Sequence, residues 1–337
     1  MKALLLLSSV FMLSSVSVRA QDELSIGMVT DTGGIDDKSF NQGAWEGMKQ
    51  WGQEHGKVEG LDGYSYFQSD TEADYITNLN LASQSEIDII YAIGYRLQAA
   101  VTEVAQQYPE QNYAMVDSII ELDNVASLNF ADEEAAFLAG VAAATTTATD
   151  KVGFIGGVEG VVIDKFEAGF VAGVKAVNPD IKISVQYAGS FTDPSKGRTL
   201  AAAMYANDVD IIFHASGPTG NGVFAEAKDL VAIDPDRKLW VIGVDLDQTA
   251  EGEFTIDGES RNIHLTSTLK NTGNVIRSFT EEVAEDGFKA GIQWFNLANN
   301  GVGLADGQLS EDSMQAIKDY QQRIIDGDIA VPDKPIN

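Results

Sequence analysis

The chain has 337 residues, no cysteine and a formal net charge of -29. This length allows two domains of ordinary size. The lack of cysteine excludes disulfides and thiolate chemistry, and we expect no lipid attached through an N-terminal cysteine. The strong negative charge argues against nucleic acid or an anionic membrane as a partner.

The first 20 residues have the pattern of a secretory signal. Lys2 is followed by an apolar run at 3–16 and by a small-x-small sequence at 18–20. The apolar run is too short to span a bilayer, and no later stretch reaches spanning length. We therefore expect a signal peptide at 1–20 and an exported, soluble mature chain that starts at about Gln21.

Residues 26–30 form a short apolar, β-branched run typical of a buried strand. Asp31 ends this run, a glycine turn follows, and an aspartate at 36–37 can cap a helix that carries Phe40 and Asn41. Polar groups at the carboxyl end of a strand are typical of ligand sites in open α/β sheets. The alternative is that these aspartates are turn residues and that Phe40 belongs to the core.

Strand-like and helix-like runs then alternate. We expect strands at 64–69, 87–93, 113–116 and 125–130, and helices at 71–85, 97–107 and from 132 onward. Asp70 and Asp117 end two of these strands, as Asp31 ends the first. The alternation indicates βαβ units and a parallel sheet.

The same pattern begins again at residue 151. We expect strands at 151–157, 181–187, 210–214 and 239–244, and helices at 161–177, 195–205 and 221–232. Asp245 follows the last of these strands. After these two doubly wound units come one more strand-like run at 262–267 and helices at 271–285 and 311–325, which suggests that the chain crosses back between lobes.

Several motifs of enzymes and cofactor sites fail on inspection. Gly217, Gly220 and Gly222 follow a strand, but their order does not match the dinucleotide fingerprint, and no Gly-Lys-Ser/Thr follows. The three histidines lack the spacing of a zinc site, and no Gly-x-Ser-x-Gly elbow is present. Asp245 and Asp247 suit acid–base work or hydrogen bonding to sugar hydroxyls equally well. We expect no metal, no cofactor and no catalytic residue.

A set of motifs extends over the expected mature chain. In order they are DTGGIDDKSFNQGAWEGM, IIYAIGY, MVDS, ASLNFADEEAAFLAG, VGFIGG, FEAGFVAGVKAVNP, FHASGPTGNGVF, IGVDLDQ and LTSTLKN. Together they resemble the basic-membrane-protein or PnrA-like family, the substrate-binding proteins of nucleoside ABC importers.

The resemblance implies an α/β fold of the type I periplasmic-binding-protein class. Such a fold has two Rossmann-like lobes, with parallel sheets flanked by helices, a three-crossover hinge and a ligand cleft between the lobes. We expect the N-terminal lobe at 21–130 plus about 255–290, and the C-terminal lobe at 131–254 plus about 291–337.

The resemblance also implies roles for residues of the first lobe. Asp31 and Asn41 are similar to the polar pair that binds the base of a nucleoside, and Phe40 to a ring that stacks on it. Asp117 is similar to a second acidic contact of the base.

For the second lobe the resemblance implies an aromatic ring opposite Phe40. Phe213 is one candidate for it and Phe170 is the other. Gly217 and Thr219 are expected to supply contacts from the glycine turn.

Asp245 and Lys270 resemble the pair that binds the ribose hydroxyls. A carboxylate accepts from both hydroxyls, and an ammonium group donates to them. The segment 95–98 departs from the family pattern near the expected cleft.

We therefore expect a periplasmic receptor, without enzymatic activity, that captures a nucleoside of the purine type. It would work as a free monomer and deliver its ligand to the membrane permease of an ABC importer. One alternative keeps the fold but binds a sugar or another small polar ligand. A secreted nucleoside hydrolase with a metal held by strand-end aspartates is the other, and nothing in the sequence requires it.

Overall fold

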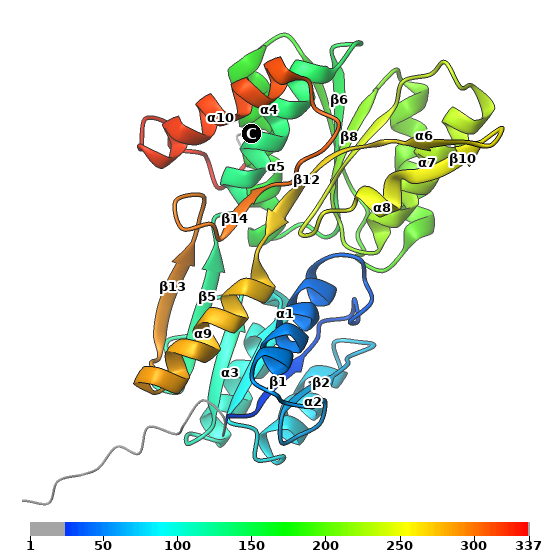
Figure 1. Ribbon diagram of the computed structural model, residues 1–337. Helices are drawn as coiled ribbons and strands as arrows, with labels where there is room; N and C mark the ends of the chain where they lie inside the picture. Colours follow the sequence, from blue (N-terminus) through cyan, green and yellow to red (C-terminus); the bar gives the residue numbers. More distant parts are fainter. Residues whose placement is uncertain (1–23, 336–337) are drawn as a thin grey trace, which may run out of the picture.

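A computed structural model describes residues 24–335. The expected signal at 1–20 lies outside the described residues. Figure 1 shows two lobes, each built on one six-stranded sheet, with segments near the C-terminus returning to both. The two-lobed α/β fold expected from the sequence is thereby confirmed. Between residues 24 and 335 no helix is long and apolar enough to cross a membrane.

The first lobe contains an all-parallel sheet with the strand order β13-β5-β4-β3-β1-β2. Its strands are β1 (Ile26–Val29), β2 (Tyr64–Phe67), β3 (Ile89–Ile93), β4 (Asn112–Val116), β5 (Val125–Phe130) and β13 (Gly291–Phe295). Helices α1 (Phe40–Glu54) and α9 (Thr272–Asp286) pack on one face. The other face carries α2 (Asp74–Ser83) and α3 (Gln98–Gln107), which follows the single turn η2 (Tyr95–Leu97).

The second lobe repeats this arrangement with the strand order β14-β12-β9-β8-β6-β7, in which only β14 is antiparallel to its neighbour. Its strands are β6 (Lys151–Gly156), β7 (Lys182–Tyr187), β8 (Ile211–Ala215), β9 (Trp240–Gly243), β12 (His264–Lys270) and β14 (Val302–Leu304). Its helices are α4 (Asp132–Thr146) and α5 (Val161–Val177) on one face, α6 (Pro194–Ala206) and α7 (Thr219–Ile233) on the other, the short α8 (Thr249–Gly252), and α10 (Glu311–Ile325), which packs on α4.

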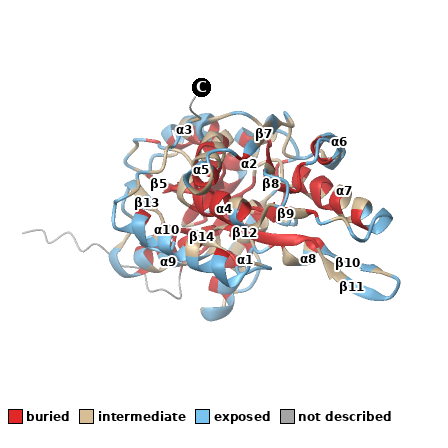
Figure 2. Cartoon of the chain, turned by 90° about the horizontal axis from the view of Figure 1, so that it is seen from above, coloured by how far each residue is buried: buried red, intermediate tan, exposed pale blue. Residues whose placement is uncertain are grey.

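Helices on both faces explain the unbroken apolar runs of the central strands. Ile26 and Met28 of β1 pack against α1. Val29 is on the other face of the sheet and packs against α2 and α3. Side chains that alternate between two buried faces must all be apolar. Figure 2 shows the result, with buried residues inside both lobes and exposed ones on the outer helices.

Helices α4 and α5 approach each other closely because glycines line their contact. A Cβ placed on Gly169 would lie 2.1 Å from the backbone oxygen of Glu133, and one on Gly173 would lie 2.0 Å from that of Phe137. Only a hydrogen atom fits at either position. These contacts fix how α4 and α5 lie on the second sheet.

The chain crosses between the lobes after β5, after β12 and after β13. The crossing segments hydrogen-bond to one another, since Ala131 N donates to Phe295 O at 2.8 Å and Asn271 N donates to Gly301 O at 2.9 Å. The lobe boundaries differ from those expected. Strand β12 pairs with β9 of the second lobe although it lies within 255–290, and β13 pairs with β5 of the first lobe although it follows residue 290.

The sequence did not predict the short strands at the periphery. The hairpin of β10 (Glu253–Ile256) and β11 (Glu259–Asn262) is half polar, and it projects from the second lobe in Figure 2. Strands β13 and β14 are edge strands, and apart from the buried Val302 their residues are exposed or half-buried. Because such strands bury few side chains, their sequences lack the apolar pattern of the central strands.

Candidate functional site

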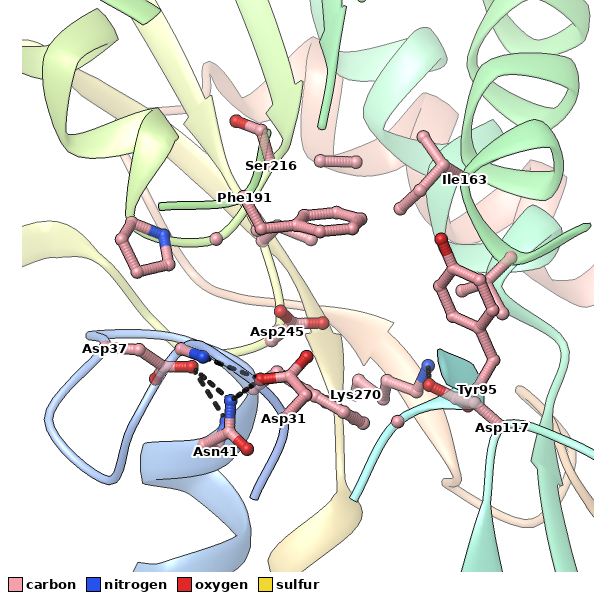
Figure 3. A pocket seen from close by; sticks show the side chains of 18 of the residues that line it. Asp31, Asp37, Asn41, Tyr95, Asp117, Ile163, Phe191, Ser216, Asp245 and Lys270 are labelled. Carbon is pink, nitrogen blue, oxygen red and sulfur yellow. Dashed lines mark hydrogen bonds and ion pairs between the residues drawn. The ribbon is translucent and has the colours of Figure 1, made fainter. Parts of the chain in front are cut away.

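A cavity lies between the lobes, at the carboxyl ends of strands from both sheets (Figure 3). Its empty space, including the open mouth, is about 580 Å³. The residues that give it its chemistry are Asp31, Asp37, Phe40, Asn41, Tyr95 and Asp117 of the first lobe, and Phe166, Phe191, Ser216, Gly217, Asp245 and Lys270 of the second.

At the first-lobe wall, Asn41 joins two carboxylates. Its Nδ2 donates to Asp31 Oδ1 at 2.7 Å and to Asp37 Oδ2 at 2.9 Å, as the dashed lines of Figure 3 mark. Asp31 Oδ1 also accepts from Gly33 N at 2.8 Å. Asp37 accepts from the backbone N–H groups of Asn41 and Gln42 and so caps α1. Asp31, Phe40 and Asn41 therefore lie together in the cavity. Asp37 fixes α1, the helix that carries Phe40 and Asn41.

Asp245 of the second lobe occupies the position in its sheet that Asp117 occupies in the sheet of the first lobe. Asp117 follows β4 and Asp245 follows β9, and these strands occupy equivalent places in the two sheets. Both residues have a left-handed backbone, with φ of 68° and 67°. This conformation is uncommon for residues other than glycine and recurs at ligand sites.

The lobes are joined across the cavity mouth by polar contacts. Ser39 Oγ, at the start of α1, donates to the Asp245 carboxylate, and Gln248 Nε2 donates to Lys38 O at 2.9 Å. Asp245 thus meets the first lobe directly. A ligand held between these walls would touch both lobes, which is how a binding protein couples closure to ligand capture.

Lys270, at the end of β12, is the cation of the site. Its Nζ donates to Asp117 Oδ2 at 2.6 Å and lies within 3.2 Å of the Asp132 carboxylate at the start of α4. The same Nζ lies 5.1 Å from the ring centre of Phe40 and 5.0 Å from that of Phe130. The residue is only 5 % exposed, so its charge is balanced by carboxylates and rings rather than by water.

The site holds more carboxylates than cations, and the pKa values of several of these buried carboxylates are raised. Burial raises the pKa of Asp31 to about 6, against hydrogen bonds from Gly33 and Asn41 that lower it. Burial likewise raises the pKa of Asp245 to about 6 and that of Asp132 to about 7, and Lys270 opposes both shifts. For Lys270, burial would lower the pKa, but the surrounding carboxylates outweigh it and raise the pKa above its ordinary value.

The remaining expected residues differ in their placement. Gly217 lines the cavity, but Thr219 does not. Phe170 and Phe213 do not line it either, because both point from α5 and β8 into the core of the second lobe, where they pack on Phe154. Lys270 and Asp245 meet through their backbones, N to O at 3.0 Å, while the Lys270 side chain turns to Asp117.

Three aromatic residues of the cavity were not expected. Phe191 lies in the loop before α6, Phe166 on α5 and Tyr95 in the segment that departs from the family pattern. Phe191 was the one that the sequence could have revealed, because it lies among Gly, Ser, Thr and Asp just after a strand. Arg96 lies over its ring, with Cζ 5.9 Å from the ring centre, and links the two lobes.

Thr219 has a place behind the loop of Phe191. Its Oγ1 donates to Ser190 O and accepts from Asp193 N, each at 3.0 Å, and its N–H donates to Phe191 O at 2.9 Å. Thr219 is fully buried. It therefore fixes the loop on both sides of the ring that lines the cavity.

The chemistry of the cavity is that of recognition. Within residues 24–335 no group of three or more His, Cys, Asp or Glu side chains is arranged to hold a metal ion. Carboxylates and an amide offer hydrogen bonds, the rings offer flat apolar surfaces, and burial makes each polar contact selective.

Comparisons with known proteins agree with this geometry. The family described as ABC transporter substrate-binding protein PnrA-like matches residues 24–335. A protein of Lactococcus lactis subsp. cremoris named ABC transporter nucleoside-binding protein BmpA is 44 % identical over 325 residues, which cover 95 % of this chain and 92 % of the relative. Basic membrane protein A of Borreliella burgdorferi is 34 % identical over 91 % of this chain and 87 % of the relative.

Solved structures resemble it as well. A solute-binding protein of an ABC transporter system from Aeropyrum pernix has a TM-score of 0.80 and 27 % identity, with 93 % of this chain and 94 % of that chain covered. An arabinose-binding protein of Geobacillus stearothermophilus has a TM-score of 0.61 at 13 % identity, over 88 % of this chain and 99 % of that chain, and shares the fold alone. The family resemblance noted in the sequence is confirmed, and so is the expectation that the protein is not an enzyme. The chain belongs to the PnrA-like family of ABC transporter substrate-binding proteins.

Proposed function

We propose that this protein captures a purine nucleoside between its two lobes and delivers it to the membrane permease of an ABC importer. The observation that carries the proposal is the combination of Phe40 and Asp31 on the first lobe with Phe191 and Asp245 on the second, all lining one cavity. Rings from two lobes suit a flat base, and the carboxylates suit its N–H groups and the ribose hydroxyls. The Lactococcus lactis relative named as nucleoside-binding supports this choice.

The charge of the cavity favours a neutral nucleoside over a nucleotide. Asp31, Asp37, Asp117 and Asp245 line it, and Lys270 is the cation that lines it among residues 24–335. Lys270 is already paired with Asp117 and Asp132. A phosphate would enter a surplus of carboxylates without a free cation to pair with it.

We assign the stacking ring opposite Phe40 to Phe191, in place of Phe213 or Phe170. Stacking on a base contributes roughly 1–3 kcal/mol and tolerates different bases. Selection among bases then falls to the hydrogen-bonding groups near Phe40, Asp31 above all. Asp245 accepts from the ribose hydroxyls on the second lobe, and Ser39 orients its carboxylate.

The place of action follows from this role. We propose that the mature protein works as a free monomer in the periplasm of a bacterium with two membranes, after removal of residues 1–20. Closure of the lobes over the ligand would be the state that the permease recognises.

Thermal unfolding tests the proposal. The protein is first unfolded and refolded to remove any ligand carried through purification, and is then heated with nucleosides, free bases or sugars. A ligand at about a thousand times its dissociation constant adds about 4 kcal/mol to the free energy of unfolding. Purine nucleosides should raise the melting temperature and sugars should not. A rise with sugars alone would overturn the nucleoside assignment in favour of the sugar-binding alternative.

Asp245→Asn should weaken the binding of ribonucleosides by about tenfold or more, since a buried carboxylate that accepts from hydroxyls would be lost. Deoxynucleosides should bind the wild type more weakly for the same reason, and the variant should discriminate less between the two. Asp247→Asn is the matched control, because this side chain is 56 % exposed and lies outside the cavity. Equal affinities of the wild type for ribose and deoxyribose forms, measured by calorimetry, would contradict the role of Asp245.

Thr219→Val should weaken ligand binding without removing a ligand contact. The variant keeps the shape of the side chain but leaves Asp193 N without its acceptor, which costs about 1–3 kcal/mol of stability and frees the loop of Phe191. Thr199→Val is the control, since Thr199 lies exposed on α6 and, within residues 24–335, its hydroxyl donates to Ser195 O of its own helix. If Thr219→Val bound ligand as tightly as the control, the loop would not depend on this hydroxyl.

A further inference from the structure

At the first-lobe wall, two oxygens lack a hydrogen-bond partner within residues 24–335: Asn41 Oδ1, which is fully buried, and Asp31 Oδ2. Asp31 Oδ1 accepts from Gly33 N and Asn41 Nδ2, whereas Oδ2 has no hydrogen bond within residues 24–335. Oδ2 borders the cavity next to Phe40, because a Cβ placed on Gly94 would lie 3.3 Å from Oδ2 and 3.4 Å from the Phe40 ring. The glycine therefore keeps the carboxylate oxygen and the ring open to the same ligand.

The neighbouring amide cannot exchange donor for acceptor. Asn41 Nδ2 donates to the carboxylates of both Asp31 and Asp37. Turning the amide over would place its oxygen against two carboxylates, which is strongly unfavourable in a buried site. Both oxygens of Asp37 already accept N–H groups, whereas Asp31 can change from an acceptor to a donor by taking up a proton on Oδ2.

The groups around Asp31 permit this proton. Asp37 of the same turn disfavours the charged form, and Arg96 of η2 favours it. The phenols of Tyr75 on α2 and Tyr95 on η2 face Asp31 as well. Across the cavity lie Asp117, Asp245 and Lys270, and that lysine is paired with Asp117 and Asp132. Burial dominates these effects and raises the pKa of Asp31 to about 6.

Purine nucleosides differ at the edge that Asp31 would meet. A 6-oxopurine such as hypoxanthine or guanine carries a proton on N1 and donates it, which suits an ionised carboxylate. A 6-aminopurine such as adenine has a bare N1 that accepts, which suits a protonated carboxyl group. The wrong combination leaves two buried acceptors facing each other, or one donor facing another.

We propose that Asp31 selects the purine through its own protonation. With Oδ2 bare the site prefers 6-oxopurine nucleosides, and with Oδ2 protonated it prefers 6-aminopurine nucleosides. The acidity of the surroundings would then decide which nucleoside the protein carries. This inference rests on the proposed function, because it takes the base to lie against Asp31.

The test is the ratio of two dissociation constants, for adenosine and for inosine, measured by calorimetry between about pH 5 and about pH 7.5. The two ligands share the ribose, so the titration of Asp245 cancels in the ratio. The ratio should favour adenosine by about tenfold more at the acidic end than at the neutral end, because the preferred partner changes when Asp31 loses its proton.

Two variants separate Asp31 from the other titrating groups. Asp31→Asn has no proton to exchange, so its ratio should stay constant with pH. Asp245→Asn should keep the pH dependence of the ratio although it binds both ligands more weakly. A wild-type ratio that does not change with pH, with both nucleosides bound, would overturn the inference and leave the proposed function intact. If neither nucleoside bound, the proposed function would fail and the inference with it.

Discussion

Replacing Lys270 by methionine should destabilise the protein by about 3–5 kcal/mol and abolish ligand binding. Methionine fills similar space but leaves Asp117 and Asp132 buried without their cation. Removing one partner of a buried ion pair costs far more than the pair itself contributes, since the remaining charge is neither hydrated nor compensated. Lys270 Nζ also lies over the rings of Phe40 and Phe130, so the Phe40 ring in the cavity would lose a neighbour.

The loss of stability in Lys270→Met should be larger at high pH than at low pH. Without Lys270 the pKa of Asp132, already raised to about 7 by burial, rises further. A carboxyl group whose pKa is raised in the folded state favours folding at low pH, and this contribution disappears as the pH rises through the folded pKa. Lys270→Met should therefore be less harmful near pH 5 than near pH 8.

Denaturant unfolding of the ligand-free protein measures both effects. Lys289→Met is the control, because Lys289 pairs with Asp286 at the surface and its side chain is 55 % exposed. That variant should unfold like the wild type at every pH. If Lys270→Met were as stable as Lys289→Met near pH 8, the charge of Lys270 would not be needed to compensate the buried carboxylates of Asp117 and Asp132.

Replacing Gly173 by alanine should destabilise the protein by about 3 kcal/mol or more. The new methyl group would lie 2.0 Å from the backbone oxygen of Phe137, far inside the contact distance of roughly 3.5–4.0 Å. A side chain could rotate away, but here the obstacle is the backbone of α4. That helix is held in turn by α10, β12 and β14, so α4 and α5 would have to separate.

Separation of α4 from α5 should disturb the cavity as well as the core. Asp132 begins α4 and holds Lys270, and Phe166 on α5 lines the cavity. We expect weaker ligand binding together with a lower melting temperature. Gly303→Ala is the matched control, because among the described residues 24–335 no atom beyond its chain neighbours lies within 4 Å of a Cβ at that position, and its backbone is not left-handed. Calorimetric unfolding in which both variants melt at the same temperature would contradict the close packing of α4 on α5.

Much of the fold could be predicted from local patterns. The central strands appear as apolar runs because helices cover both faces of each sheet, and Asp31, Asp117 and Asp245 mark the ends of strands whose carboxyl ends meet at the cavity. The lobe boundaries could not be placed in this way. Whether β12 pairs with β9, and β13 with β5, depends on contacts between distant segments and leaves no local signal.

Local sequence patterns also could not predict which aromatic residues of the second lobe line the cavity. Phe213 lies in a strand that ends at the cavity, but its side chain points toward α5 and does not line the cavity. Phe191 lies in an irregular loop, whose conformation depends on Thr219 nearly thirty residues later. Sequence patterns predict which strands end at a site, whereas the position of a loop ring is set by tertiary hydrogen bonds.

Binding of one nucleoside across both lobes is tested most directly by comparing inosine with its two halves, hypoxanthine and ribose, by calorimetry on the refolded protein. In the proposed complex the base lies against the first lobe and the ribose against the second, so that only the joined molecule contacts both. Inosine should bind with a stoichiometry of about one molecule per chain. Hypoxanthine and ribose should each bind at least about a hundredfold more weakly, because each lacks the contacts with one lobe. Ribose binding as tightly as inosine would contradict the account.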